Sequence, residues 1–187
     1  MNVSYLSEMV KAAVWGEQPP QKPRWNRWIH RNLSDRHCEP CLKLHNCWFE
    51  KDKTPLWPHH PACHCLLEDV SYDEVLTKST AQSAYSKFDP YLFDPDDFYK
   101  HGKAKMLKSW GYSIEDSSYL KEEIEKQGWE KYIAGEYTLG VLNKYGQRIS
   151  IRVEIPRKDE PGTASFITGW TVRPNGEITL NTPYGGE

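Results

Sequence analysis

The chain of 187 residues lacks any long hydrophobic run, any large excess of one charge and any signal-peptide pattern at its start. A membrane-spanning helix needs about 20 consecutive apolar residues, so we expect no membrane partner. Lys and Arg number 24 against 26 Asp and Glu, which gives a formal net charge of -2. This balance excludes a polycation that binds nucleic acid with its whole surface and leaves room only for a local basic patch. We therefore expect a soluble intracellular protein.

Cysteine is absent outside residues 38–65, a stretch that contains all 5 cysteines. An odd number confined to one stretch argues for a reducing compartment and against a disulfide framework. A Cys-x-x-Cys pair precedes the run His-Pro-Ala-Cys-His-Cys, and two such ligand pairs joined by a loop suit a structural zinc ion. The alternative is a metal-free cluster of reduced thiols. The sequence does not decide which four residues bind among the candidate ligands, which are Cys38, Cys41, His60, Cys63 and Cys65.

This stretch resembles the C-terminal signature of the phage Mu F-like minor head (head morphogenesis) proteins. The resemblance covers residues 33–70 and is carried by Cys38-Glu-Pro-Cys41, Phe49, Pro55, Pro58 and His60-Pro-Ala-Cys63-His-Cys65. The chain has His45-Asn46 where the family usually has Gly. The resemblance implies a phage or prophage origin, possible partners among phage head or portal proteins, and a location in the cytoplasm of a bacterial host or in the virion.

Aromatic and basic residues alternate just before the cysteines. Trp25 and Trp28 lie between Lys22 and Arg36 in a stretch that also contains three further arginines. Such a pattern suits base stacking with phosphate contacts, or tryptophans packed against the zinc module beside solvated arginines. We expect the packed arrangement.

The predicted fold class is α+β, with a small zinc-knuckle module followed by two helices packed on a four-stranded antiparallel sheet. The expected domains are residues 1–70, with an N-terminal helix over 3–15 and the zinc module, a linker over 71–87, and an α+β domain over 88–187. A capping box at Ser71 predicts a short helix inside the linker. Helical spacing of apolar residues predicts the two helices over 103–110 and 113–128. Alternation in 148–155 and the Asn-Gly turn at 175–176 predict the strands.

Histidine is scarce in the second domain, where His101 is the only one after His64. Its ordinary pKa lies near neutrality, and helix-start amides with Lys103 and Lys105 would attract a phosphate. Such a group can move a proton in metal-independent RNA cleavage while cations stabilise the charge on phosphorus. If strand register allows, supporting residues would be Thr168, Arg173 and Thr182, with Tyr184 beside them. The alternative roles are a helix cap, solvated lysines and cross-strand pairing.

A second resemblance covers residues 88–187. Lys100-His-Gly-Lys-Ala, Trp110-Gly-Tyr, Thr168-Gly-Trp and Leu180-Asn-Thr-Pro-Tyr resemble C-terminal domains attached to phage head proteins and polymorphic toxins. The order of helices and then sheet is similar to the barnase, EndoU, colicin and RelE type of ribonuclease fold. This resemblance implies an endoribonuclease toxin with an RNA substrate and an immunity protein. The alternative is a non-enzymatic head-associated protein whose second domain is an interaction module.

Overall fold

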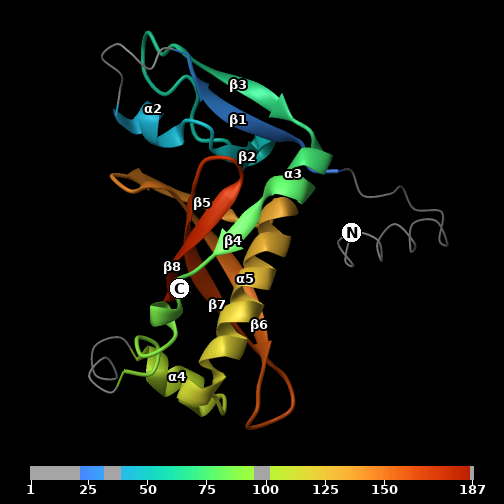
Figure 1. The fold of residues 1–187 in the computed structure, drawn as a ribbon, viewed down its shortest axis with the longest axis vertical. Helices are drawn as coiled ribbons and strands as arrows, with labels where there is room; N and C mark the ends of the chain where they lie inside the picture. The colour runs from blue at the N-terminus through green and yellow to red at the C-terminus, as the bar shows by residue number, and fades with distance from the viewer. Residues whose placement is uncertain (1–21, 32–38, 95–101, 186–187) are drawn as a thin grey trace, which may run out of the picture.

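The computed structural model describes residues 22–31, 39–94 and 102–185. These residues form an α+β structure with two sheets (Figure 1), which confirms the α+β part of the predicted fold class. The helix predicted over residues 3–15 lies outside the described residues. Within the described ranges, no helix has the length and apolar character needed to cross a membrane.

The N-terminal module is built on a three-stranded antiparallel sheet in the order β2-β1-β3. Its elements are β1 (Trp25–His30), α2 (Glu39–Leu44), β2 (Trp48–Glu50), the single turn η1 (Lys51–Lys53) and β3 (Cys65–Val70). Trp25 and Trp28 are 1% and 0% exposed. Both tryptophans are thus packed and their indoles are not free to stack on bases, but Trp25 packs on Tyr132 and Tyr137 of the C-terminal domain and not on the zinc module as predicted.

The C-terminal sheet has five strands in the order β4-β8-β7-β6-β5, which corrects the predicted four-stranded sheet. The four expected strands are present and antiparallel: β5 (Thr138–Asn143), β6 (Gly146–Pro156), β7 (Thr163–Val172) and β8 (Glu177–Gly185). The fifth, β4 (Thr80–Gln82), comes from the segment expected as a linker and pairs parallel with β8. A strand of three residues is too short to show an alternating pattern, so no periodic signal predicted it.

The rest of the segment 71–87 is also ordered into short elements. It contains α3 (Tyr72–Lys78) and the turn η2 (Tyr85–Lys87). The Ser71 hydroxyl accepts a hydrogen bond from the Glu74 amide at 3.2 Å, as the capping pattern predicted.

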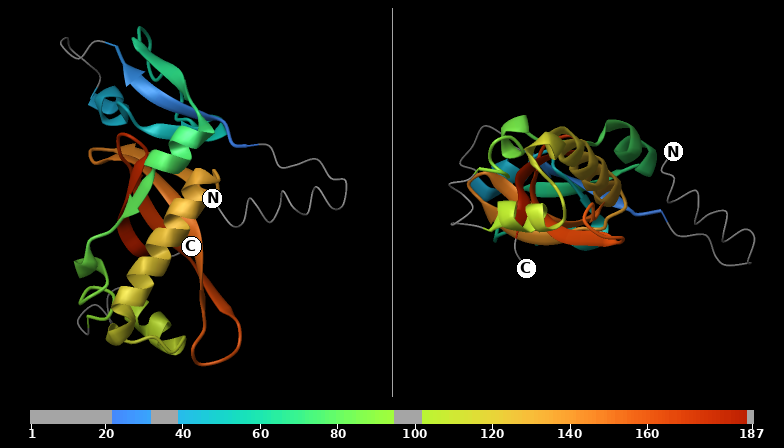
Figure 2. Two further views of the ribbon diagram at one scale, coloured as in Figure 1. Left: turned by 45° about the vertical axis from the view of Figure 1, so that its right-hand side comes forward. Right: turned by 90° about the horizontal axis from the view of Figure 1, so that it is seen from below.

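Two helices precede the four antiparallel strands, as predicted. They are α4 (Lys103–Ser109) and α5 (Ser117–Ile133), joined through the turn η3 (Ile114–Asp116). Figures 1 and 2 show α5 lying across one face of the large sheet. Every second residue of β6, from Ile149 to Ile155, is buried at 0–1% exposure. The alternate residues Arg148, Ser150 and Arg152 therefore belong to the opposite face.

The two sheets share one hydrophobic core. The Trp25 ring lies 5.0 Å from that of Tyr132, at the end of α5. The Tyr132 hydroxyl donates to the Trp48 carbonyl at 2.7 Å, and the Glu50 amide donates to the Tyr137 hydroxyl at 2.9 Å. The N-terminal module is therefore packed directly on the C-terminal domain.

Candidate functional site

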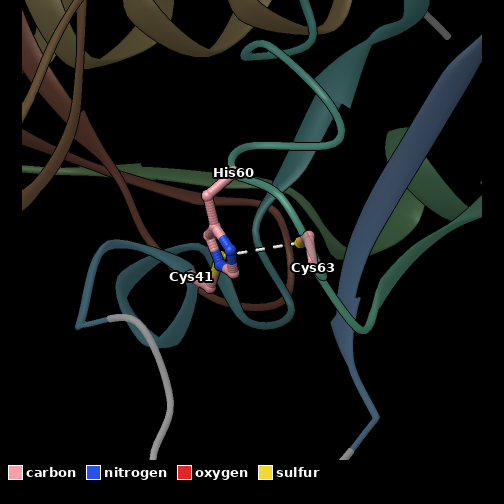
Figure 3. A group of neighbouring side chains, drawn as sticks. All are labelled: Cys41, His60 and Cys63. Carbon is pink, nitrogen blue, oxygen red and sulfur yellow. Dashed lines mark hydrogen bonds between the residues drawn. The ribbon is translucent and has the colours of Figure 1, made fainter.

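Cys41, His60 and Cys63 converge from two separate segments (Figure 3). Cys41 lies in α2, whereas the other two lie in the loop between η1 and β3. The Cys41 Sγ is 3.6 Å from His60 Nε2 and 3.9 Å from Cys63 Sγ. All three ligand atoms lie within 4.8 Å of one another, so this group could hold a metal ion.

The separations match those of a tetrahedral site. With metal–sulfur bonds of about 2.3 Å and a metal–nitrogen bond of about 2.0 Å, neighbouring ligand atoms stand about 3.6–3.8 Å apart. A disulfide would bring two sulfurs to about 2.05 Å, far closer than the 3.9 Å between Cys41 and Cys63. The separations of Cys41 from His60 and from Cys63 are thus close to those between ligands of a tetrahedral ion.

The loop also prepares His60 for binding. Its Nδ1 lies 2.8 Å from the Pro61 carbonyl oxygen, and a carbonyl can only accept, so Nδ1 carries the proton. This leaves the Nε2 lone pair directed at the cluster, the arrangement that fixes histidine tautomers in metal sites. The turn that permits it places Ala62 at a positive φ of 59°.

Cys63 is suited to act as a thiolate. Burial tends to raise its pKa, but hydrogen bonds from the backbone of Cys65 and His59 and from the neighbouring thiols together lower the pKa below its ordinary value. A thiolate is the form of cysteine that binds metals. Cys47, by contrast, is buried away from the cluster, donates to the Val172 carbonyl, and has a pKa raised to about 12 by burial.

Of the two remaining predicted ligands, the structure describes only Cys65. Cys38 lies outside the described residues. Cys65 is buried at the start of β3, and its thiol interacts with those of Cys41 and Cys63. It is not among the three whose ligand atoms all lie within 4.8 Å.

The predicted catalytic residues are not gathered in one cleft. His101 lies outside the described residues. Lys103 donates to the Tyr91 hydroxyl at 2.8 Å, and Lys105 is exposed on the same helix. Arg173 donates to the Tyr145 carbonyl, beside the β7–β8 turn, which lies at the opposite end of the sheet from α4 (Figure 1).

The two predicted threonines lie within the large sheet, where they take part in its packing and strand pairing. Thr168 is 0% exposed, donates to the Ile151 carbonyl and accepts from Trp170 Nε1. Its hydroxyl is fully used on the core side of the sheet, beneath α5. Thr182 is half-buried and pairs with Gly169, while the side chain of Tyr184 lies outside the described set.

A polar surface on the opposite face of the large sheet was missed by the sequence analysis. We call it the open face, and its polar residues include Arg148, Ser150, Arg152 and Glu154 of β6, Ser165 and Thr171 of β7, and Asn181 of β8. Arg148 Nη1 donates to Thr171 Oγ1 at 3.1 Å, and Asn181 Nδ2 donates to the same oxygen at 2.7 Å. Arg152 Nη1 donates to Ser165 Oγ at 3.0 Å.

The open face carries two arginines and the exposed carboxylate of Glu154. Arg152 is exposed and Arg148 half-buried, and each arginine bonds to a hydroxyl group and forms no ion pair with any residue that the structure describes. Pairing between β7 and β8 shifts register beside Asn181, and such bulges often re-aim side chains near functional sites. The available sequence signal was the polar half of the alternating β6 pattern, which we interpreted only as a solvated face.

Neither a curated protein nor a solved structure matches this chain, but a protein family does. Residues 78–185 match the family described as "Domain of unknown function (DUF6883)". The match begins at the end of α3 and spans β4, α4, α5 and the four antiparallel strands. Because it covers more than half of the 187 residues, the chain belongs to the DUF6883 family.

Proposed function

We propose that the chain is a phage- or prophage-derived protein in which a structural zinc ion stabilises the N-terminal module and the C-terminal domain acts on RNA as a metal-independent endoribonuclease toxin. The observation that carries the RNA-directed part is the open face, with two arginines held by hydroxyl groups and without an ion pair to any described residue. Guanidinium groups in that state bind phosphates through paired hydrogen bonds.

Zinc is supported by the chemistry of the donors and by their spacing. Two thiols and an imidazole are soft or intermediate ligands, whereas magnesium and calcium select oxygen. The sulfur–sulfur separation of 3.9 Å suits the zinc–thiolate bond length. A further cysteine from the candidate set would complete four ligands, leaving no position for a reacting water, so the expected role is structural.

His101 remains the proposed general acid or base, with Lys103 and Lys105 as phosphate-binding groups at the start of α4. RNA cleavage needs a group that exchanges a proton near neutral pH, and the second domain has no other imidazole. Thr168 has no place in this site, because its hydroxyl is buried and bonded on the helix side of the sheet. The order of α4, α5 and four antiparallel strands agrees with the ribonuclease-like resemblance.

The second candidate is a non-enzymatic head-associated protein whose C-terminal domain is an interaction module. It is favoured by the separation of Lys103 from Arg173, which lie at opposite ends of the sheet. Under this proposal, the zinc module docks the protein to a phage head or portal protein, and no RNA is cut.

RNA binding by the full chain tests the open face. The double variant Arg148→Ala, Arg152→Ala should weaken binding of a single-stranded RNA oligonucleotide by about tenfold or more and reduce its salt dependence. The matched control is Arg157→Ala, because this arginine is already paired with Asp159 and Glu160. Equal loss in both variants, or no binding by the wild type, would remove the RNA-directed proposal.

Cleavage is tested separately by expressing the protein in bacteria and examining total RNA for discrete cuts. His101→Ala should abolish cutting while thermal unfolding stays unchanged. If the wild type neither harms cells nor cuts RNA, the interaction module becomes the better account. If His101→Ala cuts as well as the wild type, the domain is a nuclease with a different proton donor.

A further inference from the structure

The indole N–H of Trp28 lies buried beside the metal cluster without a satisfactory acceptor. Trp28 is 0% exposed, and its Nε1 forms no full hydrogen bond with any described group. The nearest interaction that it makes is with the Cys65 thiol. Since buried N–H groups are nearly always paired, this donor indicates an acceptor that is stronger than a neutral thiol.

Strand register explains why these two side chains meet. In the small sheet Trp28 pairs with Leu67, and His30 pairs with Cys65. Trp28 and Cys65 are thus diagonal neighbours on the same face of an antiparallel pair, within reach of a long aromatic side chain. An indole N–H can only donate a hydrogen bond, so from this position it can bond to the Cys65 sulfur when that sulfur acts as an acceptor.

The sulfur of Cys65 also borders the three clustered ligands. Its thiol interacts with both Cys63 and Cys41, and the loop that carries His60 and Cys63 leads into β3, which begins at Cys65. A shift of the Cys65 side chain, with its backbone held in β3, would bring a fourth donor to the cluster. Metal sites commonly add such an outer hydrogen bond to a ligand, and its removal costs about 10–100-fold in affinity.

We propose that Cys65 supplies the fourth ligand of the metal and that Trp28 is the positioning residue that donates its indole N–H to the bound thiolate. This inference rests on the proposed metal centre. On binding, the Cys65 thiol proton leaves to solvent as the metal–sulfur bond forms, and the thiolate then provides the acceptor that Trp28 otherwise lacks.

Cobalt substitution of the full chain tests the ligand assignment. In the proposed site three thiolates bind Co²⁺, so Cys65→Ser should remove about a third of the sulfur-to-cobalt absorption, whereas Cys38→Ser should leave it unchanged. The reverse result assigns the fourth position to Cys38 and overturns the inference while keeping the metal site. A wild-type protein that binds neither cobalt nor zinc would overturn the metal centre itself.

The role of Trp28 is tested with Trp28→Phe against Trp25→Phe. Both tryptophans are buried with an unpaired Nε1, but Trp25 packs on Tyr132 of α5, and its position three residues before Trp28 in β1 places it on the opposite face of the strand. Competition with a chelator should show metal affinity reduced at least about tenfold in Trp28→Phe only. Equal effects in the two variants would mean that only packing is lost, and would overturn the assignment.

A measurement on the unaltered protein covers the case in which Trp28→Phe does not fold. The indole N–H resonance of Trp28 should move downfield when Zn²⁺ is added to metal-free protein, because a hydrogen bond to thiolate forms, while the Trp25 resonance stays in place. An unmoved Trp28 resonance overturns its role as a donor.

Discussion

Gly128 sets the distance between α5 and the large sheet. A Cβ added there would lie 2.5 Å from Cζ2 of the Trp170 ring, which is itself 0% exposed. Alanine is intrinsically better in a helix by about 1 kcal/mol. The rigid ring has no room to withdraw, so crowding outweighs helix propensity at this position.

We therefore expect Gly128→Ala to lower the free energy of unfolding by about 1–3 kcal/mol, the usual cost of overpacking a core. Urea denaturation measures it. Ser118→Ala, at an exposed position of the same helix, is the control and should be nearly neutral. A stabilised Gly128→Ala would show that the helix and sheet separate easily.

Asp116 links the start of α5 to the loop between β6 and β7. Lys158 Nζ lies 2.6 Å from its carboxylate, and the Ser113 amide donates to it at 2.9 Å. The hydrogen bond from Lys158 is the main reason that the pKa of Asp116 is lowered from its ordinary value. Stability from this lowered pKa is fully present above the unfolded pKa of about 3.9 and is lost as the pH falls through the folded value.

Asp116→Asn should thus lower stability at neutral pH by about 1 kcal/mol or less, since the pair is partly exposed, and should flatten the loss of stability in acid. Denaturation midpoints between neutral pH and acid measure both effects. Glu115→Gln, an exposed neighbour, should keep the wild-type profile. An Asp116→Asn profile parallel to the wild type would contradict the linkage.

The residues that the sequence revealed best are those whose chemistry depends on local spacing. Cys41, His60 and Cys63 converge as the ligand spacing predicted. Which face of the sheet receives Thr168 depends instead on register, and a shift of one residue reverses every side chain. Only the packing of Trp170 under α5 settles that choice.

At the scale of elements, β4 is a strand whose role could not be predicted from a periodic pattern in the sequence. Its pairing with β8 covers an otherwise free sheet edge, and its neighbours tie it to α5 through a hydrogen bond from Trp129 Nε1 to the Ser79 carbonyl. Ser83 adds two hydrogen bonds to the Glu125 carboxylate. None of these contacts leaves a periodic signal in the chain, whereas α4, α5 and the long hairpins do.

A fragment that begins at Lys78, where the family match starts, should therefore be more stable and more soluble than one that begins at Phe88. Loss of β4 exposes the β8 edge, and exposed edges promote association. Thermal unfolding and sedimentation of the two fragments measure the difference. Identical behaviour would mean that β4 contributes nothing to the domain, in agreement with the linker that the sequence suggested.

At the scale of the whole molecule, the two sheets meet through main-chain and side-chain contacts. The Asn175 amide donates to the Asn46 carbonyl at 2.8 Å, and Gly176 lies so close to Trp48 that a Cβ would stand 2.7 Å from its ring. Cys41 in α2 converges with His60 and Cys63 of the loop before β3, and α2 also contacts β6 of the large sheet. The proposed metal centre would therefore be connected to the C-terminal domain, so the loss of the metal should not stay local.

We expect chelation of the metal to destabilise the whole chain by about 3–4 kcal/mol relative to protein in free zinc a few hundred-fold above its Kd. Hydrogen exchange should show the amides of β1 and β3 losing protection first, then the end of α5 around Tyr132, while the centre of β6 and β7 stays protected longest. Cys41→Ser should reproduce the chelated pattern, and His64→Ala, an exposed histidine outside the cluster, should not. Exchange confined to the loop around His60 would show that the small sheet holds without its metal, and that the shared aromatic core alone joins the two parts of the molecule.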